Sequence, residues 1–171
     1  ITAGPTYENL DPVRFIGNYS SGKMGIAIAE SLANNGCKVE LILGPTSLNI
    51  EHDNIVITRV RNAEQMFEAC IKLFPKMNIA VMSAAVADYT PVAVSDTKIK
   101  KKDEEFVIHL KKTKDILKHL GSIKKEKQIL IGFALESNNE KNYALKKLEE
   151  KNADAIVLNS LNDKGAGFSH D

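Results

Sequence analysis

Segments with the apolar pattern of a strand alternate with segments patterned as helices, and this alternation is the strongest constraint on the fold. In residues 62–74, apolar side chains recur at intervals of three and four, which gives a helix one apolar face. The β-branched run Ile55–Thr58, by contrast, is typical of a strand. Because strands joined by helices pair in parallel, the sequence predicts an α/β fold. The expected form is a Rossmann-like, doubly wound, mostly parallel sheet with helices on both faces.

The expected elements follow one another along the whole chain. Strands are expected at 1–3, 38–43, 54–60, 79–83, 106–110, 128–133 and 154–158, and helices at 24–35, 62–74, 115–120 and 139–152. In the first helix a stripe of small residues, Gly25, Ala29 and Ala33, predicts a close approach to the sheet. Ligands of such sheets bind beyond the carboxyl ends of the strands, so functional residues are sought there.

Composition and charge exclude several classes of protein. The chain has 171 residues, of which 23 are Lys or Arg and 22 are Asp or Glu, so its formal charge is +1. This balance argues against a protein that binds nucleic acid, which usually carries a basic excess. No apolar run approaches the roughly 18 residues needed to cross a bilayer, so no membrane contact is expected.

The cysteines and histidines indicate a reduced, cytoplasmic protein without a zinc site. Cys37 and Cys70 form no CxxC pair, and two cysteines are too few for a disulfide scaffold. Cys70 falls on the apolar face of the helix at 62–74 and is expected in the core. The histidines show no metal-binding spacing, and no G-x-S-x-G motif favours a hydrolase.

The two ends suggest a piece of a longer protein. The chain begins at Ile1, without a methionine, inside an expected strand, and it stops at Asp171 after a Gly-rich loop. We therefore expect one domain, residues 1–171, that is truncated at both ends.

A long connection follows the first strand. Such connections are usually about two to six residues long, whereas here Gly4 ends the strand and the next helix begins only near residue 22. The backbone amides of residues 21–23 would form an anion site at the helix N-terminus, although an N-capping serine beside a glycine explains the same residues. The spacing of Gly17 and Gly22 imitates a P-loop, but Met24 stands where Ser or Thr would bind magnesium. The dinucleotide glycine fingerprint is also missing.

Two polar residues follow the strand at 79–83. Asp88 is an acceptor suited to a base amino group or a ribose hydroxyl, and capping of a small-residue turn explains it equally well. Lys98 is offset from the lysine run that follows it, which favours an inward position serving a phosphate as a point charge.

Further candidates come from the last third of the chain. Phe133 ends an expected strand and is placed to stack on a base, although a core aromatic is the commoner role. Lys147 and Lys151 lie one helical turn apart, as a pair that brackets a polyphosphate would. Favourable placement near a helix C-terminus explains the same lysines.

Several short motifs occur in a characteristic order. They are Asp11-Pro12-Val13-Arg14-Phe15-Ile16-Gly17-Asn18, Ser20-Ser21-Gly22-Lys23-Met24-Gly25, Ala84-Ala85-Val86-Ala87-Asp88-Tyr89, Lys98-Ile99-Lys100-Lys101, Gly132-Phe133-Ala134, Lys147-Leu148 with Lys151 before Asp154, and Gly165-Ala166-Gly167-Phe168 with Asp171. Together they resemble the phosphopantothenoylcysteine synthetase family over nearly the whole chain. The likeness is closest to the synthetase half of the bacterial bifunctional decarboxylase/synthetase.

This resemblance implies a step of coenzyme A synthesis. Members of the family join 4′-phosphopantothenate to L-cysteine with CTP and a divalent cation, normally Mg²⁺. The substrate carboxylate attacks the α-phosphate of CTP and pyrophosphate leaves. The cysteine amine then attacks the acyl cytidylate and releases CMP. The resemblance also implies a homodimer, an upstream decarboxylase domain that holds FMN, and further strands and a helix after residue 171.

The resemblance assigns roles to particular residues. Asn18 would hydrogen-bond the acyl oxygen in both half-reactions, and Lys98 would close over the nucleotide as the second catalytic residue. Arg14, Asn18, Ser21 and Gly22 would bind the substrate. The expected nucleotide contacts are Met82, Ser83, Ala84, Asp88, Lys98, Lys114, Asp115, Ile116, Leu117, Phe133, Lys147 and Lys151. The metal ligands are not assigned.

The chain departs from the family pattern at two positions. Lys114 stands where the family usually has proline, and Gly17 replaces a commoner serine.

Two other functions are alternatives to the ligase. An NAD(P)-dependent reductase of the short-chain type would share the topology, but it needs a glycine fingerprint directly after the first strand. A non-catalytic nucleotide-binding module is the other alternative.

Overall fold

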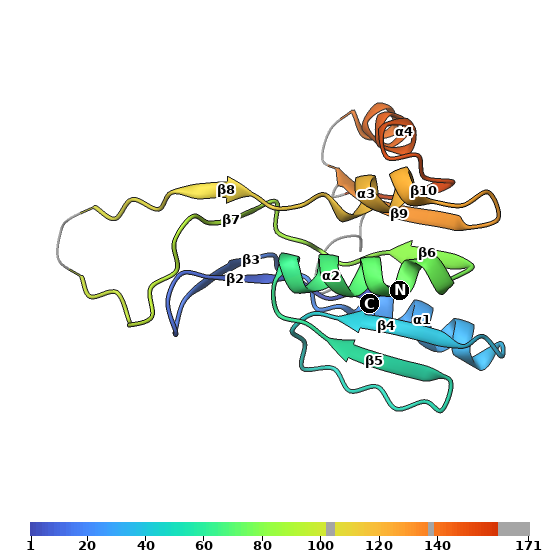
Figure 1. Ribbon diagram of the computed structural model, residues 1–171, viewed down its shortest axis with the longest axis horizontal. Helices are drawn as coiled ribbons and strands as arrows, with labels where there is room; N and C mark the ends of the chain where they lie inside the picture. The colour runs from blue at the N-terminus through green and yellow to red at the C-terminus, as the bar shows by residue number, and fades with distance from the viewer. Residues whose placement is uncertain (102–104, 137–138, 161–171) are drawn as a thin grey trace.

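A six-stranded parallel sheet forms the centre of the molecule (Figure 1). The computed structural model describes residues 1–101, 105–136 and 139–160, so the Gly165–Phe168 motif and Asp171 lie outside the described residues. In chain order the strands are β1 (Thr2–Ala3), β4 (Val39–Leu43), β5 (Ile55–Arg59), β6 (Ile79–Met82), β9 (Ile129–Glu136) and β10 (Ala155–Ser160). They lie side by side in the order β10-β9-β6-β1-β4-β5, and all paired neighbours run parallel.

The order of the strands reverses between β1 and β6. From β1 the chain builds outward through β4 to β5, and it then crosses back to β6 and builds outward through β9 to β10. This is the doubly wound arrangement, and its carboxyl edge is where ligands of such sheets bind. The predicted α/β fold is confirmed.

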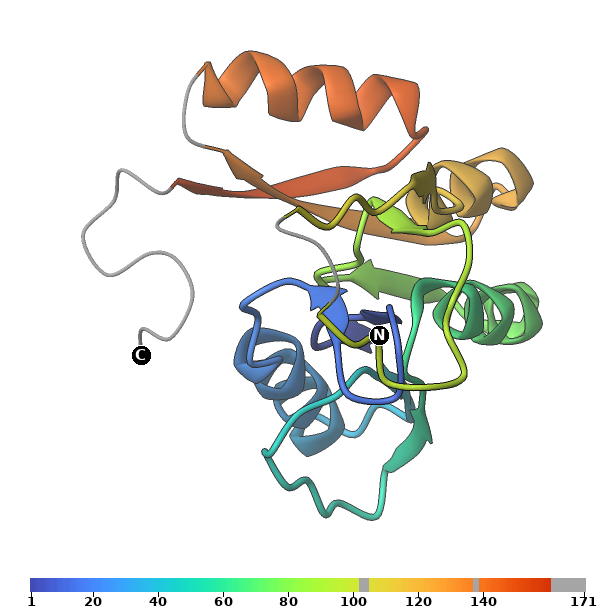
Figure 2. The same cartoon turned by 90° about the vertical axis from the view of Figure 1, so that its left-hand side faces the viewer.

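Helices cover both faces of the sheet (Figure 2). The helices are α1 (Lys23–Asn34), α2 (Ala63–Leu73) with the short 3-10 helix η1 (Phe74–Lys76), α3 (Ile116–Ile123) and α4 (Glu140–Glu150). Leu41 belongs to the core cluster under α1, whereas Ile42 belongs to the cluster under α2 and α3. Successive strand residues point to opposite faces, so α1 lies on one face, with α2 and α3 on the other. α4 packs against β9 and β10.

The small-residue stripe of α1 packs as the sequence predicts. Gly25, Ala29 and Ala33 are buried. A Cβ atom on Gly25 would lie only 2.6 Å from the Cβ atom of Ala3 on β1. A larger residue there would push α1 away from the central strand.

The two cysteines differ in burial. Cys70 lies on α2 with its side chain buried in the core, as predicted, and burial raises the pKa of its thiol to about 12. Cys37 is exposed after α1. Because the thiolate is the reacting species, we expect a thiol reagent at neutral pH to modify Cys37 alone in the folded protein, and both cysteines in denaturant. Rapid reaction of two thiols without denaturant would contradict this packing.

Two antiparallel pairs extend beyond the carboxyl edge of the sheet (Figure 1). The hairpin pairs β2 (Tyr7–Asn9) with β3 (Phe15–Gly17), and the arm, described at residues 89–101 and 105–112, pairs β7 (Tyr89–Pro91) with β8 (Leu110–Lys112). The strand predicted at 106–110 is wrong except for Leu110, because the partner strand β7 offers only three residues for pairing. The hairpin and β7 were not predicted.

The described part of the chain includes no helix with both the length and the apolar character that crossing a membrane requires.

Candidate functional site

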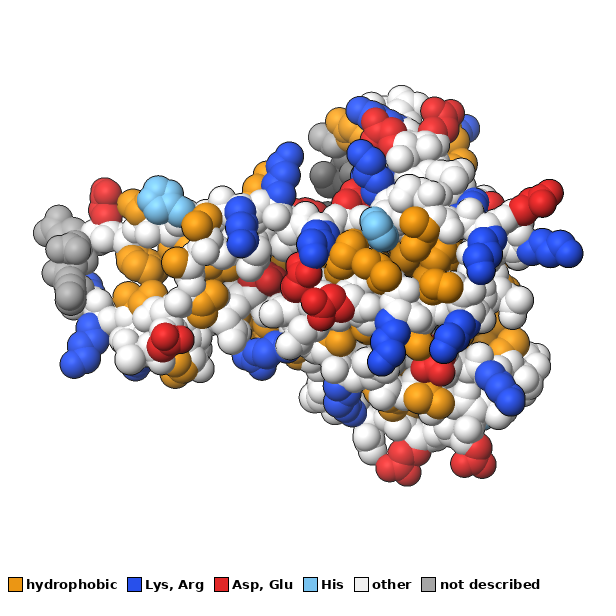
Figure 3. Space-filling view, in the orientation of Figure 1, with side chains coloured by type: hydrophobic (Ala, Val, Ile, Leu, Met, Phe, Trp, Pro, Cys, Tyr) orange, Lys and Arg blue, Asp and Glu red, His pale blue; other side chains and the backbone are white. Residues whose placement is uncertain are grey.

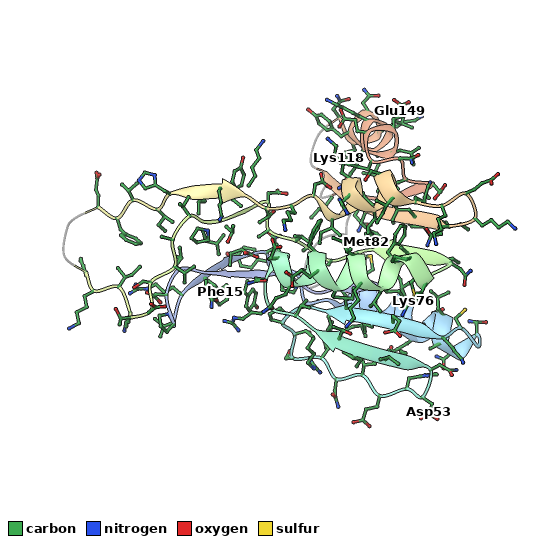
Figure 4. The ribbon with its side chains drawn as sticks, in the orientation of Figure 1. Phe15, Asp53, Lys76, Met82, Lys118 and Glu149 are labelled. Carbon is green, nitrogen blue, oxygen red and sulfur yellow. The ribbon has the colours of Figure 1, made fainter. Side chains whose placement is uncertain are left out.

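A cavity of about 560 Å³ opens at the carboxyl edge of the sheet, beside the point where the strand order reverses. Figure 4 labels Met82, the last residue of β6, which lies at its wall. The lining residues are Thr2, Met82, Ala84, Val86, Asp88, Tyr89, Lys112, Thr113, Lys114, Asp115, Ile116, Leu117, Phe133, Lys147 and Lys151. A volume of this size suits a nucleotide-sized ligand, since ligand cavities are typically about 300–1,000 Å³.

Most of the residues predicted to contact a nucleotide come together in this cavity. They are Met82, Ala84, Asp88, Lys114, Asp115, Ile116, Leu117, Phe133, Lys147 and Lys151. Two predicted residues do not line it. Ser83 donates its hydroxyl to the carbonyl oxygen of Thr2 at 2.7 Å. Lys98 is exposed on the arm, so the inward position predicted for it is wrong. The structure therefore supports one shared site for ten of these residues, and their role in nucleotide binding stays a prediction.

The cavity is basic. Its lining includes four lysines, at positions 112, 114, 147 and 151, but only two aspartates, Asp88 and Asp115. Such an excess of positive charge in a concave site attracts anionic ligands. Phosphate groups are the ligands that this charge and shape favour.

Asp115 and Lys151 form the central ion pair of the site. Asp115 caps the N-terminus of α3 by accepting from the backbone N–H of Lys118 at 2.9 Å, and its second oxygen accepts from Lys151 Nζ at 2.6 Å. Burial alone would raise the pKa of Asp115. Hydrogen bonds from Lys151 and Lys118 and the charges of Lys151 and Lys147 outweigh burial and hold the pKa below its usual value. Asp115 is therefore ionised at neutral pH, and its bond to Lys151 Nζ fixes Lys151 beside the cavity.

Lys147 and Lys151 project from the end of α4 toward the same ligand space. Lys147 Nζ donates to the carbonyl oxygen of Phe133 at 2.7 Å, and Lys151 follows α4 as its C-cap. The predicted one-turn spacing thus brings both ammonium groups to the cavity from one helix. Lys114 is different, because its Nζ bonds to Glu64 and lies 4.7 Å from the ring centre of Phe67.

Asn18 lies against the rim of the cavity. Its side-chain Nδ2 donates to the carbonyl oxygens of Ala85 at 3.1 Å and Val86 at 3.4 Å. Val86 lines the cavity, so these bonds place the carboxamide next to it. The two carbonyl oxygens also fix its orientation, since only the NH₂ group can face them. The carboxamide oxygen Oδ1 is then directed away from both.

Two threonines, which were not predicted, hold the segment 84–87, to which Asn18 is bonded. Thr2 Oγ1 accepts from the backbone N–H of Ala84 at 3.2 Å, and Thr6 Oγ1 accepts from Ala87 at 2.9 Å. Both threonines are buried. Their hydroxyl groups fasten the chain after β6 to β1 and to the residues that follow β1. No local sequence pattern distinguishes such buried hydroxyls from ordinary strand residues.

The remaining substrate candidates lie outside the cavity lining. Arg14 Nη1 donates to Asp11 Oδ2 and to the carbonyl oxygen of Ile99, both at 2.9 Å. Gly22 is the N-cap of α1 with a left-handed φ of 83°, and Ser21 Oγ accepts from the N–H of Lys23 at 3.3 Å. Gly22 rather than the serine therefore occupies the N-cap. Anion binding by Ser21 and Gly22 stays a prediction.

The site does not resemble a dedicated metal cage. Within residues 1–101, 105–136 and 139–160, no three His, Cys, Asp or Glu side chains are grouped as metal ligands. Magnesium that arrives with a nucleotide is held differently, mainly by phosphate oxygens and one or two carboxylates. Asp88 and Asp115 in the cavity fit that second mode.

The fold and the site define a Rossmann-like α/β domain with a basic ligand cavity at its strand-order reversal. The family model described as "DNA/pantothenate metabolism flavoprotein C-terminal domain" matches residues 1–171. The chain belongs to this family.

Similar proteins give a consistent fold and two different names. A "Cysteine/Cysteine sulfinic acid decarboxylase" from an unknown prokaryotic organism is 52% identical over all of this chain and 48% of its own length. The "Coenzyme A biosynthesis bifunctional protein CoaBC" of Bacillus subtilis (strain 168) is 48% identical over all of this chain and 42% of its own length. The chain thus spans about half the length of these relatives. A solved C-terminal domain of a CoaBC protein is 49% identical, has a TM-score of 0.79, and matches 91% of this chain and 73% of that chain.

Proposed function

We propose that this chain carries the CTP-dependent ligase activity that joins 4′-phosphopantothenate to L-cysteine in coenzyme A biosynthesis. The observation that carries the proposal is the lysine-rich cavity at the strand-order reversal, with Asn18 held against its rim. Family membership and the name of the Bacillus subtilis relative support the same pathway. The other relative is named for decarboxylation, so the test must separate the two chemistries.

The first half-reaction brings two anions together. The carboxylate of phosphopantothenate attacks the α-phosphate of CTP, the new P–O bond forms, and pyrophosphate leaves with the electrons of the broken P–O bond. Catalysis of such a step depends on positioning and on neutralising charge. Lys147 and Lys151 meet that demand, because both ammonium groups are already ordered at the cavity by Phe133 and Asp115. A magnesium ion held by the nucleotide phosphates and a cavity carboxylate would add to this neutralisation.

Asn18 acts, on this proposal, in the second half-reaction. The amine of L-cysteine attacks the acyl carbon of the cytidylate, CMP leaves, and the nitrogen loses a proton. The resemblance implies that the Asn18 amide hydrogen-bonds the acyl oxygen. The geometry favours another contact, because Nδ2 is already bonded to Ala85 and Val86. Its Oδ1 is an acceptor suited to an N–H group of the attacking amine.

The arm and the hairpin supply a surface for a homodimer. Their exposed apolar residues are Val13, Phe15, Tyr89, Val92, Val94, Phe106, Val107, Ile108 and Leu110. Figure 3 shows hydrophobic side chains gathered over this projecting part. Exposed apolar side chains that gather on one part of a surface favour an interaction site there. On this proposal a second copy of the chain covers it.

The test measures product formation with each nucleotide in turn. The protein, expressed with the sequence that flanks this chain in its gene, is given phosphopantothenate, L-cysteine and Mg²⁺ with CTP, ATP, UTP or NADPH. We expect pyrophosphate to form with CTP and not with NADPH, in an amount equal to the sum of phosphopantothenoylcysteine and its decarboxylated product. Release of CO₂ from cysteine without a nucleotide, or turnover with NADPH alone, would overturn the proposal.

Ligand-induced stabilisation tests the cavity separately from turnover. A ligand present at about 100 times its dissociation constant should stabilise the fold by about 2.7 kcal/mol. We expect CTP with Mg²⁺ to raise the melting temperature more than NADPH or FMN does. A rise with NADPH and none with CTP would favour a reductase.

The lysine pair gives a sharper test of the cavity. Lys151→Met removes the charge next to Asp115 and should weaken CTP binding about tenfold or more, since hydrogen bonds to charged groups contribute about 1.5–3 kcal/mol. Lys146→Met is the matched control, because Lys146 pairs with Glu150 on the same helix and does not line this cavity. The measurement is CTP affinity by calorimetry. Equal affinities for the two variants would remove Lys151 from the site.

A further inference from the structure

One buried carboxylate fastens the arm to the turn of the hairpin. Asp11 lies between β2 and β3, and its side chain is 0% exposed. Its Oδ1 accepts from the backbone N–H groups of Val13 at 2.8 Å and Arg14 at 2.9 Å. Its Oδ2 accepts from Arg14 Nη1 at 2.9 Å and from the backbone N–H of Ile99 at 3.1 Å. One oxygen therefore organises the turn, and the other holds the arm.

Arg14 binds the carbonyl group of the same arm residue, Ile99. Its Nη1 also donates to the carbonyl oxygen of Ile99 at 2.9 Å, so both backbone polar groups of Ile99 are held by the Asp11–Arg14 pair. A second bond runs from the N–H of Ser95 to the carbonyl oxygen of Leu10 at 3.0 Å. The arm is thus joined to the hairpin turn on both sides of Asp96–Lys98.

The charge state of Asp11 suits this role. Burial alone would raise the pKa of Asp11, but hydrogen bonds from Val13, Ile99 and Arg14, with the charge of Arg14, hold it below its usual value. A buried carboxylate is tolerated only when it is paired and hydrogen-bonded in this way. Asp11 is therefore ionised at neutral pH and accepts at both oxygens.

This contact fixes the backbone next to Lys98. Lys98 directly precedes Ile99, so the peptide bond that follows Lys98 is the one whose N–H Asp11 binds. The Lys98 side chain itself is exposed. Its backbone is fixed next to Ile99 and its side chain is exposed, so the side chain can extend toward a bound anion.

We propose that Asp11 is a positioning residue, which holds the backbone of the arm at Ile99 so that Lys98 is presented to the nucleotide. Asp11 does not line the cavity. Its catalytic consequence rests on the ligase function proposed above and on the role that the resemblance gives Lys98 in it. The physical contact, in contrast, can be tested without any assay of activity.

The informative variant is Asp11→Asn. The asparagine Oδ1 can keep the two turn contacts, while its NH₂ group replaces Oδ2 and faces the N–H of Ile99 and the guanidinium of Arg14, donor against donor. The turn is preserved and the contact to the arm is lost. Asp96→Asn is the matched control, because Asp96 is an exposed carboxylate on the same arm. Arg14→Lys is a second, milder variant, which keeps the charge but lacks the planar fork of donors.

The first measurement is limited proteolysis by trypsin, which cleaves after Lys98, Lys100 and Lys101. The protein is expressed with the sequence that flanks this chain in its gene, and melting temperatures confirm folding. We expect cleavage of the arm to be about tenfold faster in Asp11→Asn, intermediate in Arg14→Lys, and within twofold of the wild type in Asp96→Asn. Unchanged cleavage in a folded Asp11→Asn protein would overturn the proposal.

The second measurement separates an effect through Lys98 from any other effect. We expect Asp11→Asn to lower kcat/KM for CTP about tenfold, mainly through KM, in the wild-type background. In a Lys98→Ala background the same change should alter it less than twofold. An equal loss in both backgrounds would overturn the proposal, because Asp11 would then act independently of Lys98. Wild-type protein that makes no product with CTP would instead refute the ligase function, and proteolysis would still decide the contact.

Discussion

Replacing Gly121 by alanine adds one methyl group, and we expect it to lower the free energy of unfolding by about 3 kcal/mol or more. Gly121 is buried on α3. A Cβ atom there would lie 1.8 Å from the carbonyl oxygen of Lys151 and 2.9 Å from its carbonyl carbon. Both atoms are backbone, so no side-chain rotation relieves the overlap. α3 and the end of α4 would have to separate.

Helix propensity opposes this effect but is too small to reverse it. Alanine is favoured over glycine inside a helix by about 1 kcal/mol. Overpacking a well-filled site usually costs about 1–3 kcal/mol, and an approach of 1.8 Å to backbone belongs at or above the top of that range. The Asn152 side chain also donates to the carbonyl oxygen of Gly121 at 2.8 Å, and this bond would be strained as well.

The melting temperature measures this prediction directly. In a domain of this size about 1 kcal/mol corresponds to roughly 2–4 °C, so the expected decrease is roughly 6–12 °C. Gly36→Asn is the control, since Gly36 has a left-handed φ of 84° that asparagine tolerates and open space around its Cβ position. We expect the control to melt within a few degrees of the wild type. A Gly121→Ala protein that melts as high as the control would show that the two helix ends can move apart freely.

Long periodic segments were predictable, and short paired strands were not. The helix expected at 62–74 and the parallel strands around it follow from apolar periodicity, and the doubly wound order follows from their alternation. The hairpin has two strands of three residues, whose stability comes from pairing with each other and from the stacked rings of Tyr7 and Phe15, 3.8 Å apart. Three residues are too few to show a period of two.

The misplaced strand at 106–110 has a related cause. Its apolar residues alternate, which predicts a strand in an excursion from the main fold. In the structure Phe106 and Ile108 are exposed on the arm, and pairing starts only at Leu110. Alternation shows that a segment has an apolar face, but it does not show whether that face meets the core of the same chain.

The residues of the candidate site also fall into those that the sequence predicts and those that only tertiary contacts reveal. Lys147 and Lys151 were predicted from their one-turn spacing on a helix that could be recognised, and Asp115 was predicted from the family resemblance alone. The structure gathers all three in one cavity. Asp11 and Thr6 acquire their roles only from segments about 80 residues away in sequence, as their bonds to Ile99 and Ala87 show. Tertiary contacts of this kind leave no local pattern in the sequence.

The Asn18→Asp variant is expected to separate the two half-reactions. In the wild type, Nδ2 donates to the carbonyl oxygens of Ala85 and Val86. An aspartate would place a carboxylate oxygen against those two oxygens, so the side chain must turn away from its position on the rim. Lys147 and Lys151 are untouched by this change, and pyrophosphate release should therefore stay within about tenfold of the wild-type rate.

Amide formation should suffer far more. Loss of one preorganised hydrogen-bonding group at a reacting centre typically lowers the rate by about 10²–10³. We therefore expect the acyl cytidylate to accumulate when the protein is mixed with CTP, phosphopantothenate and L-cysteine, and to be detected in quenched samples by mass spectrometry. Asn35→Asp is the control, since Asn35 Nδ2 also donates to a backbone carbonyl, that of Ser31 at 2.8 Å, but at the far end of α1.

The rate of pyrophosphate release, compared with the rate of amide formation in the same variant, decides what Asn18 does. If both half-reactions slow equally, the residue orders the nucleotide and its Oδ1 has no special contact with the amine. If amide formation alone slows, the acceptor role is supported. Asn18→Ala then distinguishes a missing acceptor from a harmful charge, because alanine removes Oδ1 without adding a negative group beside the phosphates. A comparable loss in both variants would place the effect on the missing acceptor, whereas a loss confined to the aspartate would place it on the new charge.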